Sequence, residues 1–371
     1  MKRALVVGAG IVGAACAERL ARDGFVVTVV DHRPVGSVAT GAGMGHILVM
    51  DDPPAEFALT LRSRVLWDEL AHELPASVDR AGCGTLWVAA DDDEMAEAEK
   101  KRARLAAAGV AAELCTPARL AQHEPNLRPG LAGGLRLSED SIVYPPAAAA
   151  WFLARAGAVG ERHVHSARVE RVESGRATLA DGRVLESDVI VLAAGLETRA
   201  LVPVLPLRAR KGHLVITDRH PGFCTNEIVE LGYIKNAHGA GLESVACNVL
   251  ARPNGQVLVG SSRQFDVEDL AIEPRMVAKV LARATEFLPS IAALRAIRAW
   301  TGLRATTPDG LPIVGPLPGA PGVFLATGHE GLGITASTGT AELVADLAAG
   351  RRGALDPAPY RVERFQEARR G

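Results

Sequence analysis

The N-terminal segment alternates short apolar runs with a glycine-rich turn and an amphipathic stretch. Residues 4–7 form a short apolar run, which predicts a buried strand, and Gly8–Gly13 follows it directly. Apolar residues then recur at helical spacing until the pattern ends near Gly24. Residues 25–30 form a second apolar run, typical of a parallel strand that is buried on both faces, and Asp31 follows it. This segment therefore predicts one strand–helix–strand unit with parallel strands.

Along the rest of the chain, the pattern changes character several times. Some segments show alternating strand patterns with turn signals such as Pro253–Gly255, and others show apolar strand runs, helices and glycine-rich loops. We expect helices over residues 54–74, 91–108, 144–156, 273–288 and 334–349, with another starting at Thr116, and strands over 84–89, 168–173, 188–192, 207–217, 246–250, 256–261 and 323–326. The predicted fold class is α/β (α+β overall), with a Rossmann-like domain of residues 1–80, 145–205 and 300–371 interrupted by a β-sheet-rich domain of residues 81–144 and 206–299.

Length and charge exclude several classes of protein. The chain has 371 residues, enough for two domains of about 150–200 residues each. Its 41 basic and 43 acidic side chains give a net charge of −2 with no basic stripe, so we expect no nucleic-acid partner. No apolar stretch approaches the roughly 18–20 residues that cross a bilayer, and the first apolar run is too short for a signal peptide. We therefore expect no transmembrane segment and a cytoplasmic protein, either free or peripheral at the inner face of the membrane.

The cysteines argue against a metal cluster. All five are scattered, with no C-x-x-C pair: Cys16, Cys83, Cys115, Cys224 and Cys247. A structural zinc site or a cysteine-ligated iron–sulfur cluster needs several clustered thiolates. We therefore expect reduced, individually packed thiols and no metal in this chain.

Glycines 8, 10 and 13 form a G-x-G-x-x-G pattern between the first predicted strand and helix. In dinucleotide-binding proteins the first glycine permits a tight turn, the second lets the backbone approach a pyrophosphate, and the third lets helix and strand pack closely. The start of the helix then binds the phosphates. Asp31 can accept hydrogen bonds from an adenosine ribose, and its charge argues against the 2′-phosphate of NADP. FAD-binding and NAD-binding proteins share this pattern, so it does not by itself distinguish the two cofactors.

Two later segments favour FAD. Val191–Gly195 continues a predicted buried strand into a small-residue turn, and Thr327–Ile334 precedes the last predicted helix. Both resemble flavin-binding segments of flavoproteins. In the second, backbone N–H groups and a helix N-terminus can stabilise negative charge on a reduced flavin. An NAD dehydrogenase has no need of either segment.

Over essentially its whole length, the chain resembles the D-amino-acid oxidase-like (DAO) flavoprotein family. The resemblance lies in the order of Gly8–Gly13, Thr40–Gly45, Trp300–Gly315 and Gly328–Ile334. Within the family the chain is most similar to bacterial D-amino-acid dehydrogenase small subunits, to glycine oxidases, and to the β-subunits of hydroxyproline, opine and cyanide-forming glycine dehydrogenases. The resemblance implies FAD and a β-rich substrate-binding domain, and from the glycine pattern and the two flavin segments we expect the FAD to be bound noncovalently. It also implies oxidation of a small amino or imino acid, of the D-amino-acid or the proline or hydroxyproline type, by hydride transfer from the α-carbon to flavin N5.

The resemblance also implies catalytic residues. Arg304 would bind the substrate carboxylate through its guanidinium, and the alternative is an internal ion pair with Asp309 or another acid. His329 would lie next to the flavin, and His46 would either contact the pocket or pack within its loop. Glu330 has no secure match in the family and lies either on the surface or at the pocket rim.

The same resemblance indicates which residues contact the cofactor. They follow the glycine-rich segments and the ends of the predicted strands: Gly8, Gly10, Ile11, Val12, Gly13, Asp31, His32, Thr40, Gly43, Gly45, Val172, Ala194, Gly195, Gly328, Gly331, Leu332, Gly333 and Ile334. Tyr233, in the β-rich part, is a candidate lid over the pocket, with ordinary packing as the alternative.

Two further functions stay open at this point. One is a flavin oxidase of N-methyl amines such as sarcosine, although no cysteine here matches the motif that some such enzymes use to attach the flavin covalently. The other is an FAD-containing subunit of a multi-subunit dehydrogenase, including a subunit that binds FAD only as structure. The expected partners are a small amino or imino acid and, in the multi-subunit alternative, an iron–sulfur or other electron-transfer subunit. The electron acceptor could be oxygen, a quinone or that subunit.

Overall fold

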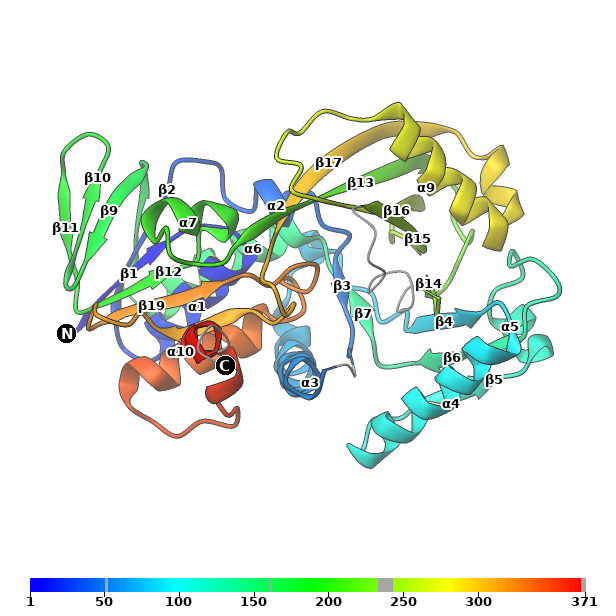
Figure 1. Cartoon of the computed structure of the whole chain (residues 1–371), viewed down its shortest axis with the longest axis horizontal. Helices are drawn as coiled ribbons and strands as arrows, with labels where there is room; N and C mark the ends of the chain where they lie inside the picture. The colour runs from blue at the N-terminus through cyan, green and yellow to red at the C-terminus, as the bar shows by residue number, and fades with distance from the viewer. Residues whose placement is uncertain (51–52, 161, 233–242, 368–371) are drawn as a thin grey trace. The chain divides into compact units, whose positions relative to one another are not determined.

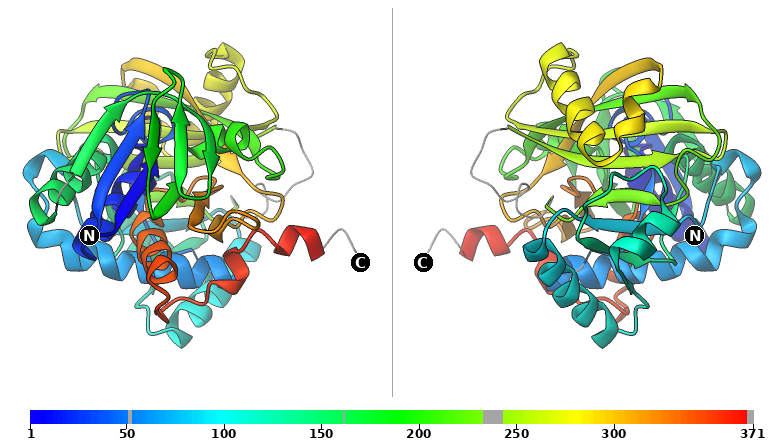
Figure 2. Two further views of the ribbon diagram at one scale, coloured as in Figure 1. Left: turned by 90° about the vertical axis from the view of Figure 1, so that its left-hand side faces the viewer. Right: turned by 90° about the vertical axis from the view of Figure 1, so that its right-hand side faces the viewer.

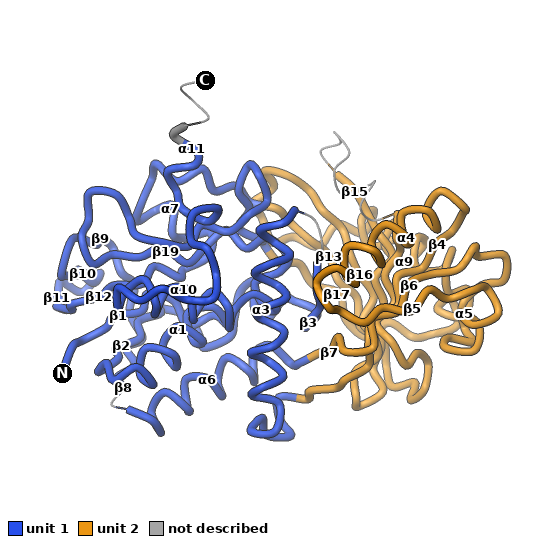
Figure 3. The backbone as a smooth tube through the Cα atoms, turned by 90° about the horizontal axis from the view of Figure 1, so that it is seen from below, with its two compact units in different colours: residues 1–78, 143–209, 303–371 blue, residues 79–142, 210–302 orange. Residues whose placement is uncertain are grey.

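The computed structural model describes residues 1–50, 53–160, 162–232 and 243–367. The chain folds into two compact units, each built from separate stretches of sequence (Figure 3). Unit 1 comprises residues 1–78, 143–209 and 303–371, and unit 2 comprises residues 79–142 and 210–302. Which unit binds cofactor and which binds substrate stays a prediction. Tyr233, the candidate lid, lies outside the described residues.

Unit 1 is built on a six-stranded sheet with the order β18-β19-β12-β1-β2-β8. Figure 1 labels its four central strands, β19, β12, β1 and β2. Its strands are β1 (Arg3–Val7), β2 (Val26–Asp31), β8 (Arg162–Ser166), β12 (Val189–Leu192), β18 (Ile313–Pro316) and β19 (Val323–Thr327). All neighbouring pairs are parallel except β18 and β19. The three strands β1, β12 and β19 are buried over almost their whole length, as their continuous apolar runs predict.

Two layers cover the two faces of this sheet (Figures 1 and 2). Alternate side chains of a strand point to opposite faces. Ala4 and Val6 of β1 join a core formed with the long helices of unit 1, whereas Leu5 and Val7 join a second core with the small antiparallel sheet β11-β10-β9. That sheet comprises β9 (Val169–Glu173), β10 (Arg176–Leu179) and β11 (Val184–Glu186). The helices are α1 (Ile11–Arg22), α2 (Val38–Gly41), α3 (Pro54–Leu70), α6 (Pro145–Val159), α7 (Thr198–Leu201), α10 (Ser337–Ala349) and α11 (Arg364–Glu367).

Unit 2 is built on an eight-stranded sheet with the order β17-β13-β16-β15-β14-β4-β6-β5. Its strands are β4 (Thr85–Ala89), β5 (Glu113–Cys115), β6 (Gly133–Leu137), β13 (Arg208–Arg219), β14 (Glu227–Glu230), β15 (Glu243–Ala251), β16 (Gln256–Phe265) and β17 (Ala296–Thr306), and its helices are α4 (Asp92–Ala107), α5 (Pro117–His123) and α9 (Pro274–Phe287). Two short strands, β3 (His46–Ile47) and β7 (Ser141–Ile142), and 3₁₀ turns at residues 71–73, 76–78, 195–197, 289–293 and 358–360 complete the elements. Helix α9 packs on β15 and β16 through a row of buried apolar side chains.

Several elements differ from the sequence-based expectation. Strand β14 was not predicted, because its sequence carries two glutamates, Glu227 and Glu230. Both are buried: Glu227 accepts a hydrogen bond from the Thr85 hydroxyl, and Glu230 pairs with Arg283. The last helix begins at Ser337 rather than near 334, because the residues before it form hydrogen-bonded turns. None of the described helices combines the length and apolar character needed to cross a membrane.

Candidate cofactor and substrate site

The turn after β1 is packed so closely that it requires glycine. Gly8 has a φ of +111°, and a Cβ there would lie 2.4 Å from the carbonyl oxygen of Ala193. Gly13 lies in the first turn of α1, and a Cβ there would lie 2.0 Å from the carbonyl oxygen of Gly8. Both glycines therefore bring the start of α1 against the ends of β1 and β12, which is the packing that the G-x-G-x-x-G pattern predicts.

The N-terminus of α1 is suited to bind an anion. Its cap residue, Gly10, has an extended backbone and no side chain that accepts from the helix. The N–H of Ile11 donates to the Thr40 hydroxyl at 3.0 Å. The first-turn N–H groups of Val12 and Gly13 have no acceptor within the helix, as at every helix start, and they carry the positive end of the helix dipole. A pyrophosphate supplies the acceptors that such a helix start needs.

Asp31 lies at the end of β2, beside this turn. One of its carboxylate oxygens accepts from the N–H of Ala9 at 2.7 Å, and the other accepts from the N–H of Arg33 at 2.9 Å. The next residue, His32, is 3.7 Å from the Glu197 carboxylate, which also pairs with Arg33. The carboxylate of Asp31 is therefore held rigidly next to the glycine turn, where each oxygen keeps a second lone pair for a ligand hydroxyl.

Two other glycine-rich segments meet in unit 1. A Cβ on Gly43 would lie 2.6 Å from the side chain of Ile334, and a Cβ on Gly45 would lie 2.1 Å from the carbonyl oxygen of Val143. The Thr335 hydroxyl joins the same two segments, because it donates to the main-chain carbonyl of His46 at 2.9 Å. Thr335 was not among the residues predicted from the sequence. The one sequence feature that could have indicated it is its position directly after the Gly328–Ile334 segment.

The end of β12 contacts the end of β19. Here the Thr327 hydroxyl donates to the carbonyl of Gly195 at 2.8 Å, and Gly195 adopts a left-handed backbone with a φ of +55°. Ala194 and Val172 are partly buried and pack against the second core of unit 1. All the cofactor and catalytic residues predicted from the sequence belong to unit 1, and the tertiary structure brings residues 8–13, 40–46, 193–195 and 328–335 together there.

The two candidate histidines have different surroundings. His329 is buried, and its Nε2 lies 2.9 Å from the hydroxyl of Thr340 on α10. Burial lowers the pKa of His329 to about 4, so the ring is neutral at pH 7. His46 is half-buried in β3. The geometry of His329 favours a role in holding the C-terminal glycine segment on α10, and its place beside the flavin stays a prediction.

Arg304 lies near the end of β17, in the part of that strand (residues 303–306) that belongs to unit 1, next to the C-terminal glycine segment. The N–H of Glu330 donates to the carbonyl of Ala305 at 2.9 Å, and the Glu330 carboxylate lies 3.9 Å from the Arg304 guanidinium. Both side chains are largely buried, with exposed fractions of 21% for Arg304 and 14% for Glu330. Asp309, the other acid considered as a partner, instead pairs with Arg364 at 2.7 Å. A partly buried guanidinium of this kind can bind a carboxylate through two parallel hydrogen bonds.

Comparison with known proteins identifies the family. The family model for FAD dependent oxidoreductases of the DAO type matches residues 3–347. The chain belongs to the DAO family of FAD-dependent oxidoreductases. It is 28% identical to a glycine oxidase of Pseudomonas aeruginosa, over 97% of this chain and 98% of that protein. It is 27% identical to a D-amino acid dehydrogenase of Cereibacter sphaeroides, over 98% of this chain and 95% of that protein. Among solved structures, the L-proline dehydrogenase from P. horikoshii shares the fold with a TM-score of 0.89, at 22% identity and with 99% and 98% of the two chains covered.

The residues of this DAO family member fit FAD. The close approaches at Gly8 and Gly13 bring backbone directly against the start of α1, where the side chain nearest to Gly10 is the small hydroxyl group of Thr40. The N–H groups of Val12 and Gly13 at the start of α1 would bind a phosphate, and the fixed carboxylate of Asp31 would accept hydrogen bonds from a ribose. This confirms the fold class, the family and the cofactor expected from the sequence. The role of each single residue stays a prediction.

Proposed function

We propose that this protein oxidises the carbon–nitrogen bond of a small amino or imino acid, and that Arg304 binds the substrate's carboxylate. The observation that carries the proposal is the partly buried Arg304 guanidinium beside the C-terminal glycine segment of an FAD-dependent oxidoreductase. A planar guanidinium fixes both oxygens of a carboxylate and thereby orients the α-carbon. Lysine would supply only a point charge.

The relatives support this substrate class. Two of them are named for glycine and for D-amino acids, and a solved structure with the same fold is named for L-proline. Each of these substrates joins a carboxylate to the carbon that bears the amine. Glycine, a D-amino acid and a proline-type imino acid therefore remain the substrates to compare, and Arg304 could bind the carboxylate of each.

The chain's own residues would position the reactants. When bound, FAD supplies the two-electron acceptor for the α-carbon hydride. Gly8, Gly13 and Asp31 would hold its pyrophosphate and ribose, and Arg304 would hold the substrate. His329 is neutral and bonded to Thr340, so we assign it to positioning rather than to proton transfer. No general base is required if the substrate amine binds in its neutral form.

We infer that the FAD is bound noncovalently. Unit 1 contains one cysteine, Cys16, which is fully buried in α1. Burial raises the pKa of its thiol to about 12, so the thiolate needed to form a thioether is scarce. Release of the yellow colour by acid or heat, with no flavin left on the denatured chain, is the expected result. Flavin that stays with the chain would contradict the inference.

A substrate panel under anaerobic conditions tests the proposed function. The purified protein is reconstituted with FAD and mixed with glycine, D-amino acids, cis-hydroxy-D-proline, L-proline and sarcosine, and the flavin absorbance is followed. We expect one class of amino or imino acid to bleach the flavin, and repeating the assay with oxygen or an artificial dye identifies the acceptor. Bleaching by sarcosine alone would favour the N-methyl amine oxidase, and bleaching by none of them would overturn the proposal.

A further inference from the structure

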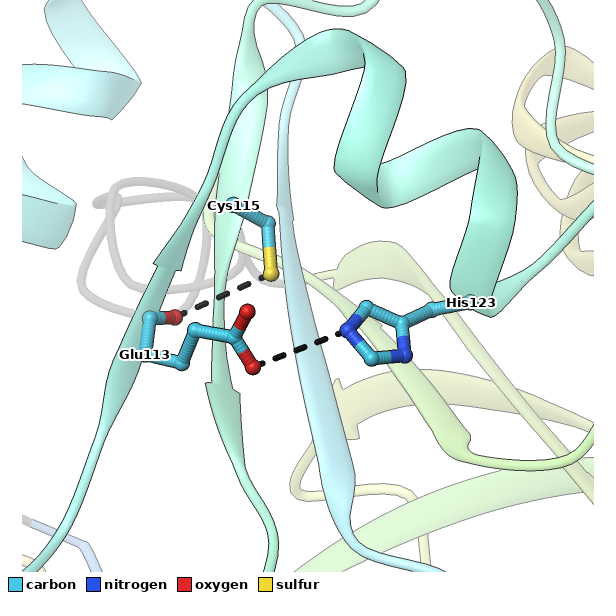
Figure 4. A group of neighbouring side chains, drawn as sticks. All are labelled: Glu113, Cys115 and His123. Atoms are coloured by element: carbon cyan, nitrogen blue, oxygen red, sulfur yellow. Dashed lines mark hydrogen bonds and ion pairs between the residues drawn. The ribbon is translucent and has the colours of Figure 1, made fainter.

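A thiol, an imidazole and a carboxylate meet in unit 2 at the edge strand of its sheet (Figure 4). Glu113 and Cys115 are two residues apart on β5, so their side chains point to the same face. His123 ends α5, which packs against β5. One potential ligand atom from each residue lies within 4.8 Å of the other two. None of the three belongs to the predicted cofactor or catalytic residues.

The carboxylate and the imidazole are spaced as ligands of one small cation, and the thiol sulfur lies within 4.8 Å of both. The Oε2 atom of Glu113 and the Nε2 atom of His123 are 3.6 Å apart, and the Sγ of Cys115 lies 3.8 Å from the main-chain oxygen of Glu113. The His123 Nε2 is buried and has no hydrogen-bond partner among the described residues. Zinc binds nitrogen and oxygen at about 2.0–2.2 Å and sulfur at about 2.3 Å, so neighbouring tetrahedral ligands lie about 3.3–3.8 Å apart.

The nearby arginines do not occupy the Glu113 oxygen that faces Cys115 and His123. Arg119 donates to the Oε1 atom of Glu113 at 2.9 Å. The other oxygen, Oε2, is the one that lies near His123. Arg136 lies opposite Glu113 in the sheet, but its guanidinium is hydrogen-bonded to the side chain of Asn226 at 2.9 Å.

We propose that Glu113, Cys115 and His123 bind a divalent transition-metal ion, with Zn²⁺ as the ion that their chemistry favours. Thiolate, imidazole and carboxylate together are typical zinc ligands, and water would complete a tetrahedral set. A hard cation such as Mg²⁺ prefers oxygen ligands alone. On binding, the Cys115 thiol gives its proton to solvent and its sulfur bonds to the metal.

This site revises the expectation that the chain holds no metal. That expectation rested on the absence of clustered cysteines, whereas here one cysteine is joined by a glutamate two residues before it and a histidine eight residues after it. The ion would link the short edge strand β5 to α5. Because it binds the folded state, it would stabilise unit 2 against unfolding.

Cobalt substitution and zinc titration test the proposal on the full-length, FAD-containing protein after chelator treatment. We expect Co²⁺ to produce a thiolate-to-cobalt charge-transfer band in the difference spectrum at one ion per chain. Cys115→Ser should abolish the band, and Glu113→Gln and His123→Gln should each weaken Zn²⁺ binding at least about 10-fold in calorimetry. Cys83→Ser, which changes a half-buried thiol elsewhere in unit 2, should leave both signals unchanged.

Thermal unfolding provides an independent readout. Zn²⁺, but not Mg²⁺, should raise the Tm of the wild-type protein by about 2 °C or more, and this shift should disappear in His123→Gln. Glu113 is partly exposed, so Glu113→Gln remains an interpretable variant even if Cys115→Ser fails to fold. The proposal is overturned if Co²⁺ gives no charge-transfer band, or if Glu113→Gln and His123→Gln bind Zn²⁺ as tightly as the wild type does.

Discussion

The guanidinium of Arg304 and the carboxylate of Glu330 form an ion pair within unit 1, with Nη1 and Oε1 3.9 Å apart. Glu330 adopts a left-handed backbone with a φ of +50°, and its N–H donates to the carbonyl of Ala305, next to Arg304. If Arg304 binds a substrate carboxylate, that carboxylate has to share the guanidinium with Glu330 or displace it. The pair therefore provides two direct tests of the proposed function.

Replacing Arg304 should impair both substrate binding and positioning. We expect Arg304→Ala and Arg304→Lys to lower kcat/KM by at least about 100-fold, equivalent to roughly 2.7 kcal/mol of transition-state stabilisation, because neither side chain can make the two parallel hydrogen bonds. Steady-state kinetics is the measurement, after FAD content is shown to be unchanged. Arg176→Ala, which removes an exposed, ion-paired arginine from the small sheet of unit 1, is the control. Near-normal turnover by Arg304→Ala would show that the carboxylate is bound elsewhere.

Neutralising Glu330 should have the opposite effect on binding. Glu330→Gln removes an internal competitor for the Arg304 guanidinium, and we expect KM for the amino-acid substrate to fall about 2- to 5-fold, because an ion pair as long as 3.9 Å is worth under about 1 kcal/mol. The kcat value should change little. A rise in KM would instead mean that Glu330 itself contacts the positively charged amine of the substrate.

Two glycine substitutions should separate folding from cofactor binding. Gly13→Ala places a Cβ 2.0 Å from the carbonyl oxygen of Gly8, so we expect loss of FAD and a lower Tm. Gly331→Ala places a Cβ where nothing lies within 4 Å, so folding should be unaffected, but FAD affinity should fall if this segment contacts the flavin. Flavin fluorescence titration and thermal unfolding measure the two effects, and Gly82→Ala, also in open space, is the control. Normal FAD binding by Gly331→Ala would remove Gly331 from the cofactor site.

His329 should make the protein sensitive to acid. Its pKa is about 4 in the folded state and about 6.5 in the unfolded chain, so between these values the unfolded chain binds a proton that the folded state does not. Stability should therefore fall as the pH drops from about 6.5 to about 4, by about 3 kcal/mol from this group. In His329→Gln, which can still bond to Thr340, this part of the loss should be absent in urea unfolding. Identical pH profiles for the variant and the wild type would contradict the assignment.

The strand–helix–strand start and its glycine turn could be predicted from the amino-acid sequence. Both depend on local rules: apolar runs and helical spacing mark the elements, and at Gly13 the carbonyl of Gly8, five residues earlier, leaves no room for a Cβ. The same rules failed at β14, where Glu227 and Glu230 break the apolar pattern of a strand. Their burial is compensated by Thr85 and Arg283, which are distant in the sequence.

Which charged and polar groups meet depends on the packing of segments that are distant in the sequence. Arg304 could pair with Asp309, five residues away, or with another acid, and packing placed Glu330 beside it while Arg364 took Asp309. The low pKa of His329 likewise comes from burial against α10, which no local pattern encodes. Side-chain pairing depends on how distant segments pack and exclude water, whereas periodicity and the contact between Gly13 and Gly8 involve near neighbours in the sequence. The fold and the cofactor pattern were therefore readable in the sequence, and the electrostatics of the site were not.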